Sequence, residues 1–345
     1  CEASCSWRCA SMCRTCALSP PPTTGQGNSS ACGELCAAKC GSIGAIGQVL
    51  ALDNASSVRV RVIPVGPLSC NCVLISTCCG CSFRCGSTAR RKSLTGEAPA
   101  ATGTCGDDCD SSSTVEGEVP FESHERCKRP TIVIDPGGDS SLILAAIAED
   151  DLDVTAILVT HGHIDHFLGA GLLQKALGPS VEVHMSPKDA WLWAAWPAQC
   201  EMMGLRAVDS NLLPDGPDAE LSDGQEFLLP LASRDGAAVM ARIVCTPGHT
   251  PGSVCVWVPK LRLVCTGDTL FCGSIGRTDL PGSDSSAILR SIHERVLPLV
   301  DEVKGCDDAS PTTVTVVPGH GALTSLGHER ETNPFLQSRT QRSRL

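Results

Sequence analysis

The chain of 345 residues has no long apolar run, few basic residues and no tyrosine. Its longest apolar runs, at residues 155–160 and 254–258, have the length of strands, whereas about 20 apolar residues are needed to span a bilayer. The 27 Lys and Arg residues are outnumbered by 38 Asp and Glu residues, and the net charge is −11. The chain therefore lacks the clustered cations that bind a nucleic acid backbone. We expect no membrane span and no nucleic-acid partner.

Cysteine is plentiful but unevenly distributed, with 17 of the 23 cysteines in residues 1–127. The remainder of the chain, with six cysteines, is typical of a reduced intracellular protein. No pair of CxxC motifs at zinc-finger spacing occurs in the Cys-rich part. Three interpretations stay open for it: thiolate metal ligands, a disulfide-rich segment, or biased composition in a weakly structured extension, which we favour.

The composition divides the chain into four parts. We expect a Cys- and Ser-rich extension at residues 1–56, disordered or used for targeting, and one folded domain at residues 57–338. A Cys-rich insertion at residues 77–130 interrupts that domain, and residues 339–345 form a basic tail. The first residue is Cys, which indicates a fragment or a processed form, and no clean signal peptide follows. We expect a cytoplasmic location, with a mitochondrion or plastid as the alternative.

The densest cluster of metal-capable side chains directly follows an apolar run. We predict a strand at residues 154–160, whose alternation sends His161, His163 and Asp165 towards one side. His166 joins them at the start of the next helix, which we predict at residues 167–177. Imidazole nitrogens and carboxylate oxygens are the ligands that zinc and similar divalent metals prefer. Four such groups within six residues predict a metal site rather than a solvated loop.

Three more predicted strands end in Gly- or Pro-rich turns that each carry one metal-capable side chain. These are residues 239–245 before His249, residues 261–266 before Asp268, and residues 312–317 before His320. A single His or Asp in a turn is more often a cap or a surface residue. Strand ends are rigid supports for a site, however, and their repetition in one chain predicts that these side chains complete the metal site.

This order of side chains resembles the metallo-β-lactamase-fold hydrolases, and within them the short, glyoxalase II-like (hydroxyacylglutathione hydrolase-like) branch. Further segments similar to that branch are VGPL (65–68) with NC (71–72), IDPGGD (134–139), TPGHTPGSV (246–254), GDTLFCGSIGRTDLPG (267–282) and ERETNPF (329–335). The resemblance implies an α/β (α+β) fold, a four-layer αβ/βα sandwich with two sheets face to face and helices outside. It also implies that the domain at residues 57–338 is the catalytic domain.

The resemblance implies a binuclear centre and a reaction. One metal would lie on His161, His163 and His249, the second on Asp165, His166 and His320, and Asp268 would bridge both. Zinc is the default, and iron or manganese would accept the same donors. The implied reaction is hydrolysis of a thioester, such as S-D-lactoylglutathione or another S-2-hydroxyacylglutathione, by hydroxide from a metal-activated water that Asp165 also orients. A thiolate leaves without a strong general acid, and no separate side-chain nucleophile is needed.

Two other functions stay open. A persulfide dioxygenase has similar motifs but uses a single iron, here on His161, His249 and Asp268. A non-catalytic metal-binding or redox-sensing protein would instead act through its Cys-rich extension. Arg277 either meets a carboxylate of the substrate or pairs with an internal acid. The absence of Tyr predicts that glutathione is not recognised in the manner of full-length glyoxalase II enzymes, and the oligomeric state is left open.

Several residues near the motifs are expected to have structural roles. Asp135 would hold the loop around the site rather than bind metal. Cys245 and Cys265 are expected to be buried as small apolar side chains. Trp191, Trp193 and Trp196 are expected to pack within a helix at residues 187–196.

Overall fold

The computed structural model describes residues 47–50, 58–77, 128–205, 213, 216–230, 238–303 and 313–337. The chain divides into two compact units, residues 1–44 and residues 45–345, and every described residue belongs to the second. The predictions made for the basic tail and for most of the Cys-rich segments lie outside the described residues.

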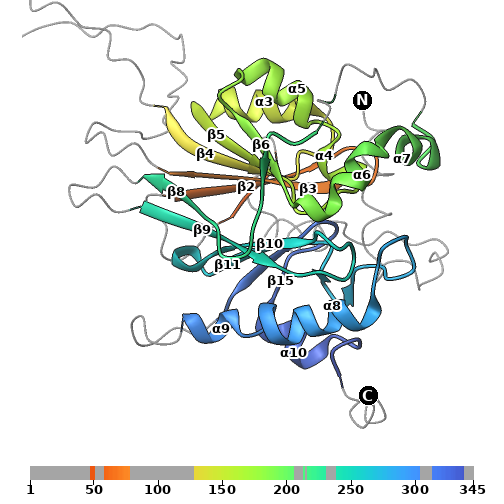
Figure 1. Ribbon diagram of the computed structural model, residues 1–345. Helices are drawn as coiled ribbons and strands as arrows, with labels where there is room; N and C mark the ends of the chain where they lie inside the picture. Colours follow the sequence, from red (N-terminus) through yellow and green to blue (C-terminus); the bar gives the residue numbers. More distant parts are fainter. Residues whose placement is uncertain are drawn as a thin grey trace, which may run out of the picture. The chain divides into compact units, whose positions relative to one another are not determined.

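The first sheet has seven strands in sequential order (Figure 1). They are β1 (Gln48–Leu50), β2 (Val58–Val65), β3 (Cys70–Thr77), β4 (Arg129–Ile134), β5 (Leu152–Leu158), β6 (Glu182–Met185) and β7 (Ala219–Glu220). Strands β1 to β4 pair antiparallel, and β4 to β7 pair parallel. Strand β1 falls within the stretch predicted as an extension, so the sheet begins earlier than expected.

The second sheet has six strands in the order β15-β14-β11-β10-β9-β8. They are β8 (Glu226–Pro230), β9 (Ala238–Cys245), β10 (Val254–Val258), β11 (Leu263–Gly267), β14 (Thr315–Pro318) and β15 (Thr324–Ser325). Only β11 and β14 pair parallel among its described strands. A separate small hairpin joins β12 (Leu270–Phe271) to β13 (Ser274–Ile275).

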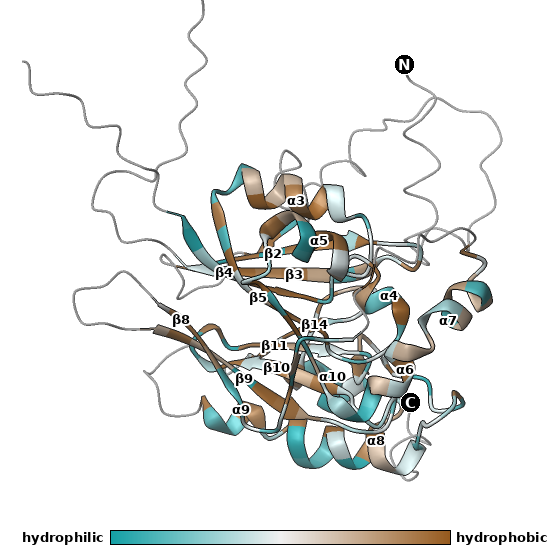
Figure 2. Ribbon diagram, turned by 45° about the horizontal axis from the view of Figure 1, so that its top comes forward, coloured by the Kyte–Doolittle hydropathy of each residue, from teal (hydrophilic) through white to brown (hydrophobic). Residues whose placement is uncertain are grey.

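Helices cover the outer face of each sheet (Figure 1). On the first sheet lie α3 (Ser140–Glu149) and α5 (Ala170–Leu177), and on the second α8 (Ser285–Ser291), the π-helical turn η4 (Ile292–Val296), α9 (Leu299–Glu302) and α10 (Leu326–Thr332). Strand alternation supports these layers. Val60 and Val73 face the core between the sheets, whereas Ile63 and Leu74 face the helices. Figure 2 shows these strands mainly in the brown of apolar residues. The predicted four-layer αβ/βα sandwich is confirmed.

The helices beside the predicted site are more broken than the sequence indicated. The helix expected at 167–177 is instead α4 (Ile164–Phe167) and α5, because the Gly169 N–H donates to Pro136 O (2.8 Å) and leaves the helical pattern. The helix expected at 187–196 is also wrong. It is replaced by η1 (Pro187–Asp189), α6 (Ala190–Ala194) and α7 (Trp196–Met202). Proline lacks an N–H, and Pro197 stands in the first turn of α7.

Strands β3 and β4 fix where the Cys-rich insertion is attached. Their pairing sets Ser76 opposite Thr131 and Val73 opposite Ile134. The insertion therefore leaves and rejoins at the end of these strands away from Asp135. In the described part of the chain no helix is long and apolar enough to cross a membrane.

Candidate metal centre

The loop after β5 carries the four predicted ligands of the HGHIDH segment. His161 is buried, and α4 turns Asp165 and His166 inward, so that these side chains are also buried. Side chains from α7 and from the turn before α6 hold the backbone of the loop: the Gly162 N–H donates to Asp189 Oδ2 (2.9 Å), and the Ile164 N–H donates to Gln199 Oε1 (3.0 Å).

Strand ends of the second sheet supply the other three predicted ligands: His249 follows β9, Asp268 follows β11, and His320 follows β14. Two glycines in these turns allow the backbone to pass close to neighbouring groups, where a side chain would not fit. Gly248 has φ +148°, and an added Cβ would overlap the Ile288 backbone. At Gly319 an added Cβ would overlap Asp268 Oδ1 and lie 2.7 Å from His166 Cε1.

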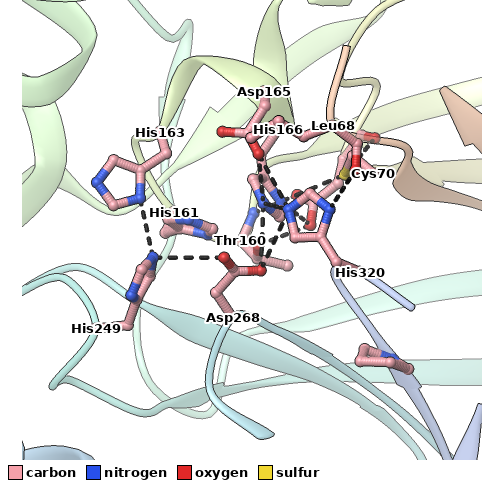
Figure 3. A network of polar contacts seen from close by, with 12 residues as sticks. Leu68, Cys70, Thr160, His161, His163, Asp165, His166, His249, Asp268 and His320 are labelled. Atoms are coloured by element: carbon pink, nitrogen blue, oxygen red, sulfur yellow. Dashed lines mark hydrogen bonds and ion pairs between the residues drawn. The ribbon is translucent and has the colours of Figure 1, made fainter. Parts of the chain in front are cut away.

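Three imidazoles, those of His161, His163 and His249, form one cluster, here called the first trio (Figure 3). His163 Nδ1 lies 2.9 Å from His249 Nε2. His161 Nε2 is buried and has no hydrogen-bond partner. All three therefore bring a ring nitrogen to a common point.

Asp165, His166 and His320 form a second cluster, here called the second trio. His320 Nε2 lies 3.0 Å from Asp165 Oδ2 and 3.2 Å from His166 Nε2. Asp268 lies between the trios, because its Oδ2 is 3.5 Å from His249 Nε2 and its Oδ1 is 3.3 Å from His166 Nε2 (Figure 3). The structure thus brings all seven predicted ligands together, in the grouping that the resemblance implies.

The donor set fits divalent cations. Ring nitrogens that face each other at 2.9 and 3.2 Å repel unless a proton or a cation lies between them. His161 Nε2 and Asp268 Oδ1 are buried here without hydrogen-bond partners, although buried polar atoms are normally paired. A mixed set of imidazole nitrogens and carboxylate oxygens suits zinc, iron and manganese alike.

Hydrogen bonds behind the imidazoles fix which nitrogen faces the centre. Carboxylates and carbonyls only accept, so Nδ1–H of His166 donates to Asp135 Oδ2 (2.9 Å) and Nδ1–H of His249 donates to Arg277 O (2.8 Å). His320 donates in the same way to Leu68 O (3.1 Å). Each Nε2 lone pair is thereby aimed at the centre, as in known metal sites. Asp135 holds the loop, as its predicted role requires.

Electrostatics keep most of these groups in the state that binds metal. Burial lowers the pKa of His161 and takes that of His163 to about 4, so both rings are neutral. Burial opposes ionisation of Asp165 and Asp268, but the charge of His166 holds the pKa of both carboxyls below its usual value.

His166 behaves differently from the other two imidazoles. Burial lowers its pKa, whereas the nearby Cys70 and the carboxylates of Asp268, Asp135 and Asp165 together raise it above the usual value. A proton on this ring and a metal cation are therefore alternatives, since ligand imidazoles must be deprotonated.

Sequence reasoning missed Asp189, which joins the two loops of the first trio. Its buried carboxylate accepts hydrogen bonds from Gly162 N (2.9 Å), Thr250 Oγ1 (2.6 Å) and Gly252 N (2.7 Å). Burial raises its pKa, while these three donors lower it. Asp189 follows a plain Pro-Lys pair, and nothing in that sequence signals the role.

The remaining predicted residues lie around the centre. Arg277 is exposed and pairs with Asp279 (2.8 Å) rather than with a buried acid. Cys265 is buried as predicted, whereas Cys245 is only half-buried. Trp193 stacks on Phe167 with centroids 4.2 Å apart, in agreement with the packing prediction.

Trp191 does not fit the packing prediction made for the three indoles. It is 44% exposed, whereas Trp193 is 1% exposed and Trp196 is partly buried against the first core.

The chain matches the metallo-beta-lactamase superfamily over residues 128–320. It is 35% identical over 209 residues to hydroxyacylglutathione hydrolase GloC of Haemophilus influenzae, covering 60% of this chain and 88% of that protein. A protein of Bacillus subtilis described as "Probable metallo-hydrolase YqgX" is 34% identical over 213 residues, covering 59% of this chain and 86% of the relative. The crystal structure of BLEG-1 B3 metallo-beta-lactamase superposes with a TM-score of 0.54 at 25% identity, covering 81% of this chain and 100% of that chain.

The family match spans more than half of the chain and agrees with the four-layer fold. The chain therefore belongs to the metallo-β-lactamase superfamily. That superfamily includes metallo-hydrolases, and the His and Asp cluster of this chain is of the kind that holds divalent metals in this fold.

Proposed function

We propose that the chain hydrolyses thioesters, with S-2-hydroxyacylglutathione as the class to test first. The observation that carries this proposal is the pair of trios joined by Asp268, because adjacent sites for two cations suit a hydrolase that activates water. The 35% identical relative named a hydroxyacylglutathione hydrolase supports the same reaction class.

The residues divide the work of the reaction. Divalent cations held by the two trios, zinc by default, would lower the pKa of a water from about 15.7 to near 7 and polarise a carbonyl oxygen. Asp165 is ionised and held by His320 at 3.0 Å, so its carboxylate can orient that water. The departing thiol has an ordinary pKa of about 8.5, so it leaves as thiolate without a general acid.

Among the described residues near the trios, no side chain competes with water as the nucleophile that attacks the thioester carbonyl. Cys70 Sγ lies 3.5 Å from His166 Nδ1, but burial raises the pKa of its thiol to about 12. A thiol at neutral pH is a poor nucleophile, because the thiolate is the reactive form. Water is therefore the nucleophile in this proposal.

The second trio also separates the hydrolase from the dioxygenase alternative, which would use a single iron on His161, His249 and Asp268. We expect purified chain to hold about two metals and to hydrolyse S-D-lactoylglutathione. Asp165→Asn should abolish hydrolysis with the fold intact, whereas the exposed Asp153→Asn on β5 should not. One iron per chain, oxygen uptake on glutathione persulfide and full activity of Asp165→Asn would favour the dioxygenase.

A further inference from the structure

A cavity of about 560 Å³ opens directly onto both trios. Helices α6 and α7 form one side of it, here called the α6–α7 wall and made by Trp191, Leu192, Met202 and Met203. Leu280 and Phe271 line the cavity as well. The side chains next to the proposed metal centre are thus mainly apolar.

Two side chains of the wall are exposed, although apolar side chains of this size usually avoid water, whereas Leu192 is buried. Met202 is 82% exposed, and Trp191 and Leu68, which also lines the cavity, are 44% and 56% exposed. Seven large apolar side chains of the described chain are exposed, and the three that line one cavity define it as a binding surface rather than scattered exposure.

The wall is fixed to the metal loop. Gln199 of α7 accepts the Ile164 N–H (3.0 Å) and donates to Gly162 O (3.0 Å) and Leu192 O (2.8 Å). Both N–H groups of its amide are therefore used between the helices and the loop, and it has no donor left for a ligand. A group bound on the wall is held at a set position relative to the trios.

Charges that would suit glutathione are missing from the described lining. Apart from the imidazoles, its only cationic side chain is Arg277, which already makes two hydrogen bonds to Asp279, of 2.9 and 2.8 Å. Glutathione carries two carboxylates and an ammonium group, and burying these against apolar side chains without partners is costly.

We infer that the preferred thioester carries an apolar arm, on its acyl or its thiol side, that lies on the α6–α7 wall. This inference rests on the proposed function and narrows its substrate. Two methionines in the wall adapt to arms of different shape, since their side chains are flexible. Glutathione thioesters are then accepted but not preferred.

Two substrate series test this with the metal-loaded full chain. One lengthens the acyl chain on a small polar thiol, and the other lengthens an apolar thiol on a lactoyl group. In the series whose arm lies on the wall, kcat/KM should rise about fourfold per added methylene, mainly through KM. The inference would be overturned if kcat/KM did not change with chain length in either series, or if S-D-lactoylglutathione were the best substrate. No turnover of any thioester contradicts the proposed function instead.

Variants and direct binding give independent readouts. Trp191→Ala should raise KM for the long apolar thioester about tenfold and leave kcat unchanged, with a smaller effect for Trp191→Phe. Leu228→Ala removes an exposed apolar side chain of β8 outside the cavity and should change neither constant. Uncleavable thioethers with apolar arms should bind in calorimetry with a negative heat-capacity change. Equal KM for Trp191→Ala and wild type, or no thioether binding, would contradict the inference.

Discussion

Two buried carboxylates, Asp135 and Asp189, organise the centre without facing the cavity. Asp135 accepts the Thr160 N–H and hydroxyl (2.7 Å each) and the His166 Nδ1–H. Asp189 accepts three donors from the loops that carry the first trio. These bonds fix the loops and the His166 ring, so the fold itself directs the imidazoles towards the centre.

Replacing the single side chain of Asp189 by asparagine should weaken the support of the first trio. An amide cannot accept on both sides, so one of the donors from Gly162, Thr250 or Gly252 would be left facing an N–H. We expect about 10- to 100-fold weaker metal binding and about 2 kcal/mol less unfolding free energy. Metal titration and denaturant unfolding measure these two effects.

Asp218→Asn is the matched control for that variant. Asp218 also accepts a backbone N–H, from Val183 (2.8 Å), and an amide N–H, from Gln174 (2.6 Å), but away from the trios. It should lose stability and keep its metal affinity. If Asp189→Asn and Asp218→Asn behaved alike towards metal, Asp189 would have no positioning role.

The sequence predicted these side chains unevenly. The seven side chains that meet at the centre could be picked out because each follows an apolar strand and is itself a metal-capable residue. Asp189 and Gln199 could not, because their roles lie in hydrogen bonds to backbone groups distant in the chain. Trp191 was expected to pack within its helix, and only the position of α6 shows that its indole lines the cavity.

Among elements, the strands followed their sequence pattern better than the helices did. The strands predicted at residues 154–160 and 239–245 are observed as β5 (Leu152–Leu158) and β9 (Ala238–Cys245), so their bounds differ by at most two residues from those expected. The helices near the site were predicted too long, because tertiary bonds such as Gly169 N to Pro136 O interrupt them. No local pattern reports such a bond. Because the helices near the site are short, the loops that they join can point in different directions.

Gly319→Ala tests the close approach of two strand ends. The new methyl would displace Asp268, which contacts both trios, so metal affinity should fall about 10- to 100-fold while the fold persists. Circular dichroism and metal analysis measure these quantities. The matched control is Gly327→Ala in α10, where no atom lies within 4 Å of the added methyl. Unchanged metal binding in Gly319→Ala would refute the steric argument.

In the molecule as a whole, the centre lies across the two sheets. The loop after β5 supplies four predicted ligands, and the second sheet supplies His249, Asp268 and His320. Cations bound there would link both halves of the described fold. Metal binding and global stability are then coupled, since a ligand that binds only the native state stabilises it.

We therefore expect a chelator to lower the thermal stability of metal-loaded protein. At a free metal concentration of 100 times Kd the stabilisation is about 2.7 kcal/mol, which corresponds to a Tm change of about 5–10 °C at this size. Differential scanning calorimetry with and without chelator measures the change, and added zinc should restore Tm. An identical Tm in both states would show that the cations do not link the sheets.

Strand β1 sets the expected result of truncation. It pairs with β2 from Gln48 opposite Val62 to Leu50 opposite Val60. A chain beginning at residue 45 keeps this strand and should retain Tm and turnover, whereas a chain beginning at residue 58 exposes the edge of β2 and should lose stability and aggregate. Light scattering and thermal melts compare the two. Equal behaviour of both truncations would mean that β1 contributes nothing.

The attachment of the insertion has a practical consequence. Strand β3 runs eight residues from Cys70 to Thr77, so the junctions at Thr77 and Arg129 stand about 23 Å along the strand from Cys70, which contacts His166. A fluorescent reporter or an affinity handle grafted between those junctions would sit at the end remote from the cavity. This loop position is therefore suitable for inserting a foreign sequence, because an insertion there would not block the entry of substrate.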